Sequence, residues 1–396
     1  MRAGRFSWGA GRVAWGVGLA AVVVSLGVGV GWAVRDTTPP ELWLEAPARV
    51  AAGEPFEVFV SASKPVTFVL RYGDERIERV AEELRATLVA LAGRAVLQVD
   101  AVDGTGAGAL LAREIDGRRR PEPRLEAPAV LEAGDPLVAW VRLDPSTAAA
   151  SLAEVRSLTL TLDGESLPVL ARPDGWVALR GVALDAAPGT WALTLRLVDE
   201  FGPLEPVDWP IEVRSNPRPV DELNVPAGTL ALVTPAAREE EAAVLAAALA
   251  RVPPEPRWAE PFLLPVEGRD TSGFGDPRRY APGGNVSYHL GADIAAPTGT
   301  PILATNDGIV RVAGFYPIKG GWVVLDHGQR LTSHHFHLAH IDVAVGDVVV
   351  RGDVIGQVGS TGLSTGPHLH WEMRVDGVPT DPMAWIGQRY PLVVRP

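Results

Sequence analysis

All eight histidines of this 396-residue chain fall between His289 and His370. They gather mainly in three short segments, which are His289-Leu-Gly-Ala-Asp293, His334-His-Phe-His337 and His368-Leu-His370 with Glu372 just beyond. The chain has no cysteine, so disulfides and thiolate metal sites are excluded. Any metal centre built on imidazole must therefore lie in this C-terminal part of the chain.

The pair His368 and His370 has the spacing of residues on one face of a β-strand. Side chains two residues apart on a strand point the same way, and the apolar residues that alternate with this pair supply an opposite, buried face. One imidazole can then bind a metal while its neighbour reaches a metal-bound water, and the spacing leaves open which does which. Glu372 continues the polar face, where a carboxylate can hold a ligand imidazole in one tautomer.

His289 and Asp293 offer one nitrogen and one carboxylate oxygen as further ligands. Two histidines, an aspartate and a water make a four-coordinate site with an exchangeable position, which is typical of catalytic zinc. Zinc held in this way lowers the pKa of its water towards ~7 and polarises a scissile carbonyl. Each motif alone is weak support for a metal; their co-occurrence favours one.

Further motifs surround these residues. They are Ser272–Gly275, His289–Asp293, Ala296–Thr300, Asp326–Gly328, Phe336–Leu338, Val345–Asp347, Arg351–Gly352 and Val358–Glu372. With them, the last third of the chain resembles the catalytic domain of the lysostaphin-like (LytM-type) zinc metallopeptidases, which cut peptide bonds in peptidoglycan. The resemblance implies a mostly antiparallel β-domain over residues 261–396, with one zinc ion as cofactor.

By position, the resemblance makes His289, Asp293 and His370 the zinc ligands and His337 and His368 the catalytic histidines. His368 would take a proton from the metal-bound water, and His337 would stabilise the oxyanion or protonate the leaving amine. The substrate would be peptidoglycan peptide stems or cross-bridges, with the bond left open between glycyl–glycine and cross-links containing D-alanine and diaminopimelate. Protein partners from the divisome or the wall-remodelling machinery fit the same role.

Two alternatives compete with this interpretation. A non-catalytic member of the fold, acting as regulator or scaffold for other wall hydrolases, usually lacks zinc ligands, whereas this chain keeps all five positions. A biotinyl or lipoyl carrier would need a lysine in the hairpin at 345–355, and there is none. The position two before His337 is usually tyrosine in the family; here it is His335, which we expect near the cleft as a wall residue.

The N-terminal segment, residues 1–36, predicts export. Three arginines, Arg2, Arg5 and Arg12, precede an uncharged run over 13–34 that is long enough for a helix to span a membrane. The arginines place the N-terminus in the cytoplasm and the rest outside it. The run is longer than a signal h-region, which favours an uncleaved inner-membrane anchor over a cleaved signal peptide. The net charge of −12 argues against a nucleic-acid partner.

Two β-modules are predicted between the anchor and the catalytic domain, over residues 37–120 and 121–214. Leu44–Ala48 recurs as Leu125–Ala129, and Gly53–Pro55 recurs as Gly134-Asp-Pro136, both with an offset of 81 residues. Alternating strands between turn signals suggest tandem immunoglobulin-like β-sandwiches. A spacer role is favoured over binding to the wall or to a partner.

A linker with one helix is predicted over residues 215–260. Thr234 suits an N-cap, Pro235 the first helical position, and the two prolines at 253–254 a stop. We expect the helix to pack on a neighbouring domain; the alternative is that it covers the zinc cleft. Arg278, Arg279, Tyr280 and Tyr288 are further candidates for lining that cleft.

Overall fold

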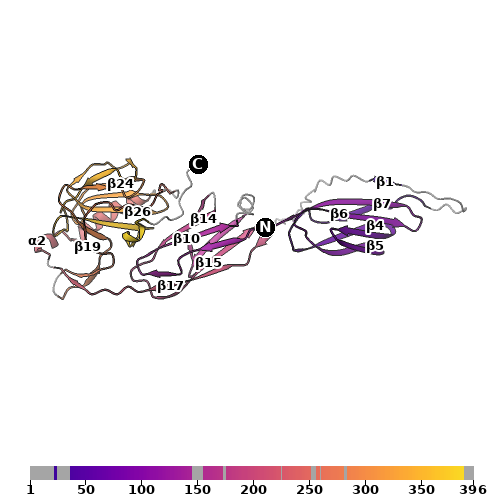
Figure 1. The fold of residues 1–396 in the computed structure, drawn as a ribbon, viewed down its shortest axis with the longest axis horizontal. Helices are drawn as coiled ribbons and strands as arrows, with labels where there is room; N and C mark the ends of the chain where they lie inside the picture. The colour runs from indigo at the N-terminus through magenta and orange to yellow at the C-terminus, as the bar shows by residue number, and fades with distance from the viewer. Residues whose placement is uncertain are drawn as a thin grey trace, which may run out of the picture. The chain divides into compact units, whose positions relative to one another are not determined.

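The computed structural model describes residues 22–24, 36–144, 155–172, 175–223, 225–250, 256–258, 260–280 and 283–387. The chain divides into two compact units, residues 1–120 and 121–396, and each is mainly β (Figure 1). The mainly β fold class is therefore confirmed. The predicted membrane-spanning run lies outside the described residues, except for β1 (Val22–Val24), a strand that pairs with β7 (Gly108–Arg118). Among the described residues, no helix has the length and apolarity needed to cross a membrane.

The first unit also contains β2 (Leu42–Glu45), β3 (Arg49–Ala51), β4 (Pro55–Tyr72), β5 (Glu75–Val89) and β6 (Gly93–Asp103). Strand β4 is continuous from Pro55 to Tyr72, with a register shift between Ser61 and Val66 in its pairing with β5. The first half of β4 pairs with β2 and the second half with β6. Buried side chains of these strands, including Phe68 and Leu97, form one core.

The second unit begins with β8 (Pro123–Glu126), β9 (Val130–Glu132), β10 (Pro136–Leu143), β11 (Ser157–Leu162), β12 (Glu165–Leu167), β13 (Val169–Arg172), β14 (Gly175–Gly181), β15 (Gly189–Asp199), β16 (Gly202–Pro203) and β17 (Val207–Arg214). These strands form two sheets, in the orders β13-β14-β10-β8 and β12-β11-β15-β17-β9. Leu137 from the first sheet and Leu160 and Leu193 from the second share one core. The two sheets therefore pack face to face.

The repeated sequence motif corresponds to a repeated local structure. In each module its first part forms a strand, β2 or β8, and the next short strand, β3 or β9, pairs in parallel with the strand that closes the module. The turn that follows has Gly53 at φ 83° in one case and Gly134 at φ 103° in the other. Glycine adopts such positive φ values at little cost, which explains why both copies place glycine there.

Strand β10 is buried on both faces. Leu137 and Val141 belong to the core of their own module, whereas Val138 and Trp140 belong to the core of the C-terminal domain. A strand covered on both sides is apolar nearly throughout, and in β10 only Arg142 is less than fully buried. The module at 121–214 therefore packs directly on the C-terminal domain.

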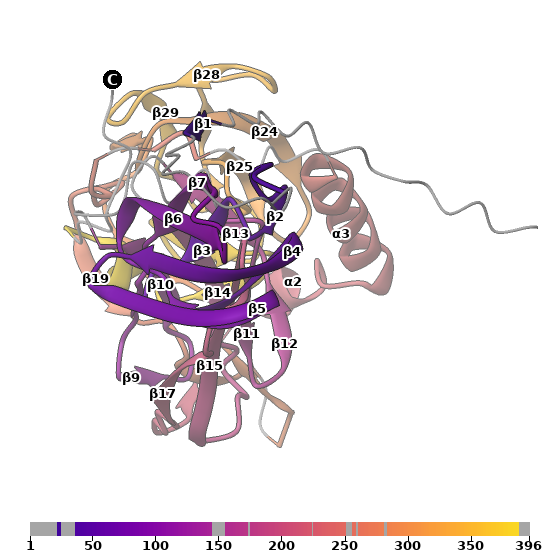
Figure 2. The same cartoon turned by 90° about the vertical axis from the view of Figure 1, so that its right-hand side faces the viewer.

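The linker contains β18 (Asp221–Glu222), α2 (Ala227–Leu230) and α3 (Pro235–Leu249). The predicted N-cap is confirmed, because the Thr234 hydroxyl accepts a hydrogen bond of 3.1 Å from the amide of Ala237. The helix ends at Leu249, earlier than its predicted stop. Its apolar face, with Val244 and Leu245, packs against the C-terminal domain over β24 (Gly308–Tyr316) and β25 (Gly320–Asp326) (Figure 2).

The C-terminal domain contains, besides β24 and β25, β19 (Arg269–Ser272), β20 (Pro277–Arg279), β21 (Val286–Tyr288), β22 (Ala292–Ala295), β23 (Pro301–Leu303), β26 (Leu331–Leu338), β27 (His340–Ile341), β28 (Val348–Val349), β29 (Val354–Gln357), β30 (His368–Val375), β31 (Val378–Thr380) and the 3₁₀ helix η2 (Pro382–Trp385). Its main sheet runs in the order β19-β22-β30-β26-β25-β24-β28, with every neighbouring pair antiparallel. The three strands that carry most of the predicted site residues, β22, β30 and β26, are neighbours at its centre.

Candidate active site

The sheet brings the three predicted metal ligands together. Asp293 on β22 lies opposite His370 on β30, and His289 lies in the turn that leads into β22. His289 Nε2 lies 3.0 Å from Asp293 Oδ1 and 2.8 Å from His370 Nδ1, and the last two atoms lie 2.8 Å apart. All three residues are buried. Donor atoms this close can all bind one ion.

The outer nitrogens of the two histidines fix their tautomers. His289 Nδ1 lies 2.8 Å from the carbonyl oxygen of Gly273, and His370 Nε2 lies 3.1 Å from Glu372 Oε1. Both partners are acceptors, so each of these nitrogens carries the hydrogen, which leaves a lone pair on His289 Nε2 and on His370 Nδ1. Two lone pairs and a carboxylate oxygen that face one another repel unless a cation lies among them. Two nitrogens and one oxygen are also a donor set that suits catalytic zinc, so the residues fit the implied metal.

The charges around the ligands favour a positive charge among them. Burial raises the pKa of the Asp293 carboxyl, but hydrogen bonds with His289 and His370 outweigh it and hold that pKa well below its usual range. Burial also lowers the pKa of His289. In His370 the effect of burial is outweighed by Asp293 and Glu372, which raise the pKa. A cation among these groups, whether a proton or a metal ion, is therefore favoured.

A second group of side chains holds the ligands in place. Glu372, which the sequence predicts as a partner of a ligand imidazole, accepts from His370 and is paired with Arg374 at 2.6 Å. Arg278 on β20 donates to Asp293 Oδ2 at 2.6 Å and to the hydroxyl of Ser272 at 2.7 Å. Its side chain is only 12% exposed. Arg278 therefore contacts a ligand directly, a role that the sequence analysis did not assign to it.

Two other candidates for the cleft wall lie differently. Arg279 forms an ion pair with Glu222 of β18, and Tyr288 is 57% exposed. Neither contacts the ligands through any interaction that the structure gives among the described residues.

The two predicted catalytic histidines flank the ligands. His368 begins β30 and donates its Nδ1 hydrogen to the carbonyl oxygen of Gly366 at 2.8 Å, and His337 near the end of β26 donates in the same way to Thr361 at 2.8 Å. Their ring centroids are 4.8 Å apart. In both rings Nε2 is left with a lone pair, and that of His368 lies 3.7 Å from Asp293 Oδ1. Both histidines can thus accept a proton beside the metal ligands.

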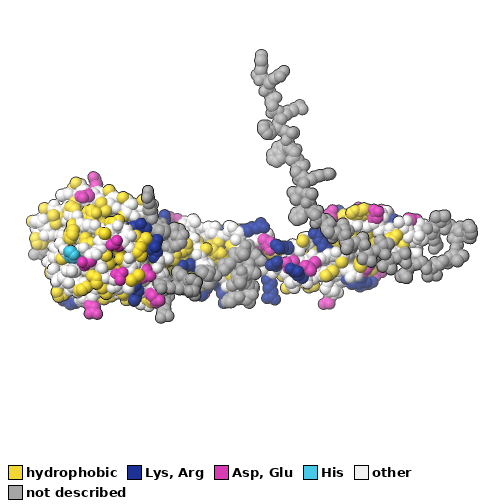
Figure 3. Space-filling model, turned by 90° about the horizontal axis from the view of Figure 1, so that it is seen from above, with side chains coloured by type: hydrophobic (Ala, Val, Ile, Leu, Met, Phe, Trp, Pro, Cys, Tyr) yellow, Lys and Arg dark blue, Asp and Glu magenta, His cyan; other side chains and the backbone are white. Residues whose placement is uncertain are grey.

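The two rings differ in exposure. His337 is 7% exposed, and burial together with His368 and His370 lowers its pKa to about 3. The side chain of His368 is 16% exposed. On the face of the molecule that Figure 3 shows, histidine occupies very little of the surface.

The expectation that His335 lies near the cleft is wrong. His335 pairs with Trp371 across β26 and β30, whereas its neighbour Phe336 pairs with His370. Trp371 belongs to the core of the domain and Phe336 stacks on the ligand His370, with ring centroids 5.0 Å apart. Since successive side chains of a strand alternate between its faces, His335 points into the core, away from the ligands.

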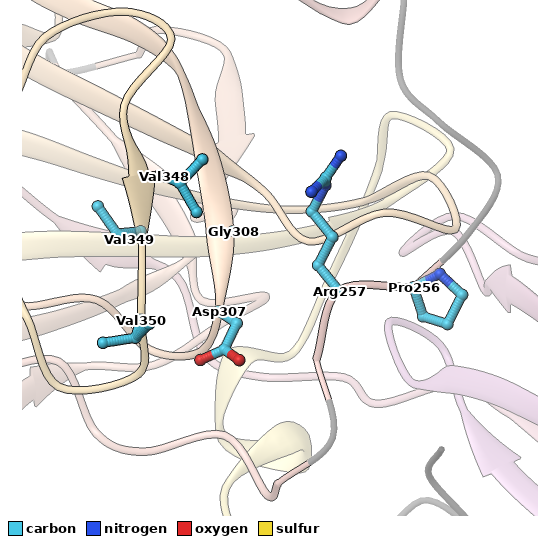
Figure 4. Close-up of a pocket in the computed structure, with 7 residues that line it drawn as sticks. All are labelled: Pro256, Arg257, Asp307, Gly308, Val348, Val349 and Val350. Carbon is cyan, nitrogen blue, oxygen red and sulfur yellow. The ribbon is translucent and has the colours of Figure 1, made fainter. Parts of the chain in front are cut away.

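A cavity of about 330 Å³ lies elsewhere in the domain. Its lining residues are Pro256, Arg257, Asp307, Gly308 and Val348 to Val350 (Figure 4). The cavity contains none of the predicted site residues. The candidate active site is therefore identified by the donor atoms of its side chains and not by this cavity.

Comparison with known proteins agrees with this chemistry. Residues 287–382 match the model of peptidase family M23. The chain is 39% identical over 137 residues to the peptidoglycan DD-endopeptidase ShyA of Vibrio cholerae, covering 34% of this chain and 29% of ShyA. It is 44% identical over 96 residues to the DD-carboxypeptidase/endopeptidase Mpg of Neisseria meningitidis, covering 24% of this chain and 22% of Mpg.

Among solved structures, a putative peptidase M23 from Pseudomonas aeruginosa is 30% identical, covering 60% of this chain and 90% of that one with a TM-score of 0.44. The chain spans less than a third of the length of the curated relatives it matches. The residues that match the family model, 287–382, include the five predicted site residues. The chain therefore carries a domain that matches peptidase family M23.

Proposed function

We propose that this chain is a zinc-dependent endopeptidase that hydrolyses the peptide cross-links of peptidoglycan. The observation that carries the proposal is the triangle of donor atoms from His289, Asp293 and His370, each separated from the next by 3.0 Å or less. The similarity to ShyA, which is named as a peptidoglycan DD-endopeptidase, supports peptidoglycan as the substrate. The retention of all five site positions favours a catalyst over a regulatory member of the fold.

Each site residue has a role that follows from its hydrogen bonds. Zinc bound by the three ligands supplies Lewis acidity, which activates a water and polarises the scissile carbonyl. His368 accepts the proton of the attacking water at Nε2, because its Nδ1 hydrogen is already donated to Gly366. The resulting imidazolium faces the Asp293 carboxylate at 3.7 Å, which stabilises its charge.

His337 is the second catalytic histidine of the proposal, and it acts as a hydrogen-bond or proton donor. Its Nδ1 hydrogen is donated to Thr361, so Nε2 can donate only when the ring is an imidazolium. Burial lowers the pKa of this ring to about 3, and the negative charge that develops on the substrate oxygen raises it again. In that state His337 stabilises the oxyanion or passes its proton to the leaving amine.

The test is digestion of defined cross-linked muropeptides by the purified full chain, with mass spectrometry of the products. The zinc-loaded chain should convert dimers to monomers, and the product masses identify the bond. His368→Ala should keep about one zinc per chain and lose turnover. Full turnover by this variant, or no cleavage of any wall peptide by the zinc-loaded chain, would overturn the proposal.

The rest of the chain suggests where this activity operates. We propose that residues 13–34 anchor the chain in the inner membrane, with the remainder on the extracytoplasmic side. In the anchored chain β1 (Val22–Val24) would have to leave its pairing with β7. The modules at 37–120 and 121–214 are proposed as immunoglobulin-like spacers that hold the peptidase domain away from the membrane. N-terminal sequencing of the mature protein tests the anchor, since a cleaved signal peptide would give a new N-terminus.

A further inference from the structure

Helix α3 buries a carboxylate in the face that packs on the peptidase domain. Glu241 is 4% exposed, and it lies on the same helical face as Ala237, Val244 and Leu245, which contact the domain or are buried. An ionised side chain is costly to bury unless its oxygens are hydrogen-bonded. An apolar residue at this position would pack without this desolvation cost. We therefore expect the carboxylate of Glu241 to make specific polar contacts with the domain.

The partners of Glu241 lie in the turn that joins β24 to β25. Its Oε1 accepts hydrogen bonds from the backbone amides of Ile318, at 2.7 Å, and Lys319, at 3.0 Å. The ammonium group of Lys319 lies 3.9 Å from the other carboxylate oxygen. The side chain of Glu241 thus accepts hydrogen bonds from two consecutive amides of the turn, and the ammonium group of Lys319 offsets the negative charge of its carboxylate.

The same turn holds the catalytic candidate His337. The carbonyl oxygen of Lys319 accepts from the backbone amide of His337 at 2.9 Å, and that of Ile318 accepts from Leu363 at 2.7 Å. Leu363 belongs to the loop that also contains Thr361, whose carbonyl oxygen accepts the Nδ1 hydrogen of His337. The turn therefore supports His337 both at its backbone and through the loop that orients its ring.

A second contact reaches a metal ligand. The ammonium group of Lys319 lies 4.5 Å from the centroid of the Phe336 ring, which stacks on His370. Movement of the turn would therefore release the packing of a ligand ring as well as the hydrogen bonds of His337.

The backbone of His337 makes this support necessary. Its φ is 66°, in the left-handed region that residues with a side chain adopt only when the surroundings hold them there. Its amide donates to Lys319, its ring donates to the carbonyl oxygen of Thr361, and its own carbonyl oxygen accepts from the amide of Thr361 at 3.4 Å.

We propose that Glu241 is a positioning residue, which holds the turn at 317–319 so that His337 stays in its catalytic orientation. The inference rests on the proposed peptidase function. It extends the catalytic unit beyond the region that matches the family, residues 287–382, to a helix that precedes it. A fragment restricted to that region would contain all five site residues and lack this support.

The test compares Glu241→Ala with Glu241→Gln in the zinc-loaded full chain. The alanine variant leaves two amides of the turn without their acceptor, and we expect kcat to fall on the order of 10- to 100-fold, with KM and zinc content little changed. The glutamine variant keeps an oxygen that accepts from both amides, so we expect it to restore most of kcat. Equal losses in both variants would overturn the proposal.

Leu245→Ala is the matched control for a purely structural effect. Leu245 lies one turn further along the same face of α3 and packs on the domain without contacting the turn in any interaction given for the described residues. This variant should lower the melting temperature while kcat, measured well below melting, stays near the wild-type value. A loss of kcat as large as that of Glu241→Ala would show that docking of the helix, and not the carboxylate, matters.

Hydrogen exchange separates this inference from the proposed function. The amides of Ile318, Lys319 and His337 should exchange faster in Glu241→Ala than in the wild type, and at nearly wild-type rates in Glu241→Gln. This result is independent of any substrate. If exchange is unchanged in the alanine variant, the positioning role is refuted even if the chain proves to be a peptidase. If the expected exchange pattern is found but the chain has no peptidase activity, only the proposed function is refuted.

Discussion

Acid should destabilise the peptidase domain through histidines that are buried in its core, and His335 provides the clearest test. Burial lowers its pKa from 6.5 to about 3. As the pH falls below about 6.5 the unfolded chain binds a proton at this residue and the folded chain does not, so stability is lost down to about pH 3. At pH 5 this linkage costs about 2 kcal/mol for one such histidine.

The perturbation is His335→Phe, which keeps a ring of similar shape and cannot be protonated. The difference in unfolding free energy between pH 7 and pH 5 should become smaller by about 2 kcal/mol. The assay is urea unfolding at both pH values, followed by pulsed hydrogen exchange on peptides from β25 and β26 so that this domain alone is observed.

Val323→Ala is the matched control. Val323 is fully buried on β25, paired with His335, and has no titratable group. Its substitution should lower stability by the same amount at both pH values. The reasoning would be refuted if His335→Phe kept the wild-type dependence on pH, because His335 would then be protonated in the folded state or not linked to unfolding.

Three further predictions concern the metal site and the domain contact. His370→Ala should abolish both zinc binding, measured by elemental analysis, and hydrolysis; retention of stoichiometric zinc would show that His370 is not a ligand. Glu372→Ala should weaken zinc binding about 10- to 100-fold in competition with a chelator, because His370 loses the acceptor for its outer nitrogen, and an unchanged affinity would contradict this. Gly181→Val should loosen the contact between the module and the peptidase domain, since even a Cβ at Gly181 would lie 2.8 Å from that of Val378; a melting temperature equal to that of the wild type would argue against the contact.

The grouping of His289, Asp293 and His370 could be predicted because the motifs that carry these residues are local in sequence. Two histidines two residues apart on a strand must share a face, and the motifs around His289 and Asp293 identify the family that uses them. The same rule would place His335 and His337 on one face, which explains the error at His335. The regular pairing of β26 with β30 ends at Phe336, and the backbone of His337 has a φ of 66°, so His337 turns to the site whereas His335 faces Trp371 in the core.

Contacts between segments that are distant in the sequence could not be predicted from local motifs or strand spacing. Arg278 is expected from the sequence only to line the cleft, and its contact with Asp293 arises because β20 pairs with β21, the strand that leads to His289. Glu241 belongs to a run of three glutamates that resembles a solvated helix face, and only the packing of α3 turns it inwards.

The most direct test of the metal site is a crystal structure of the zinc-loaded chain, with the ion located by anomalous scattering at the zinc edge. We expect one ion within about 2.0–2.2 Å of His289 Nε2, Asp293 Oδ1 and His370 Nδ1, with His337 and His368 beside it and not bound to it. An ion held by His337 or His368, or one bound away from this triangle, would contradict the proposed centre.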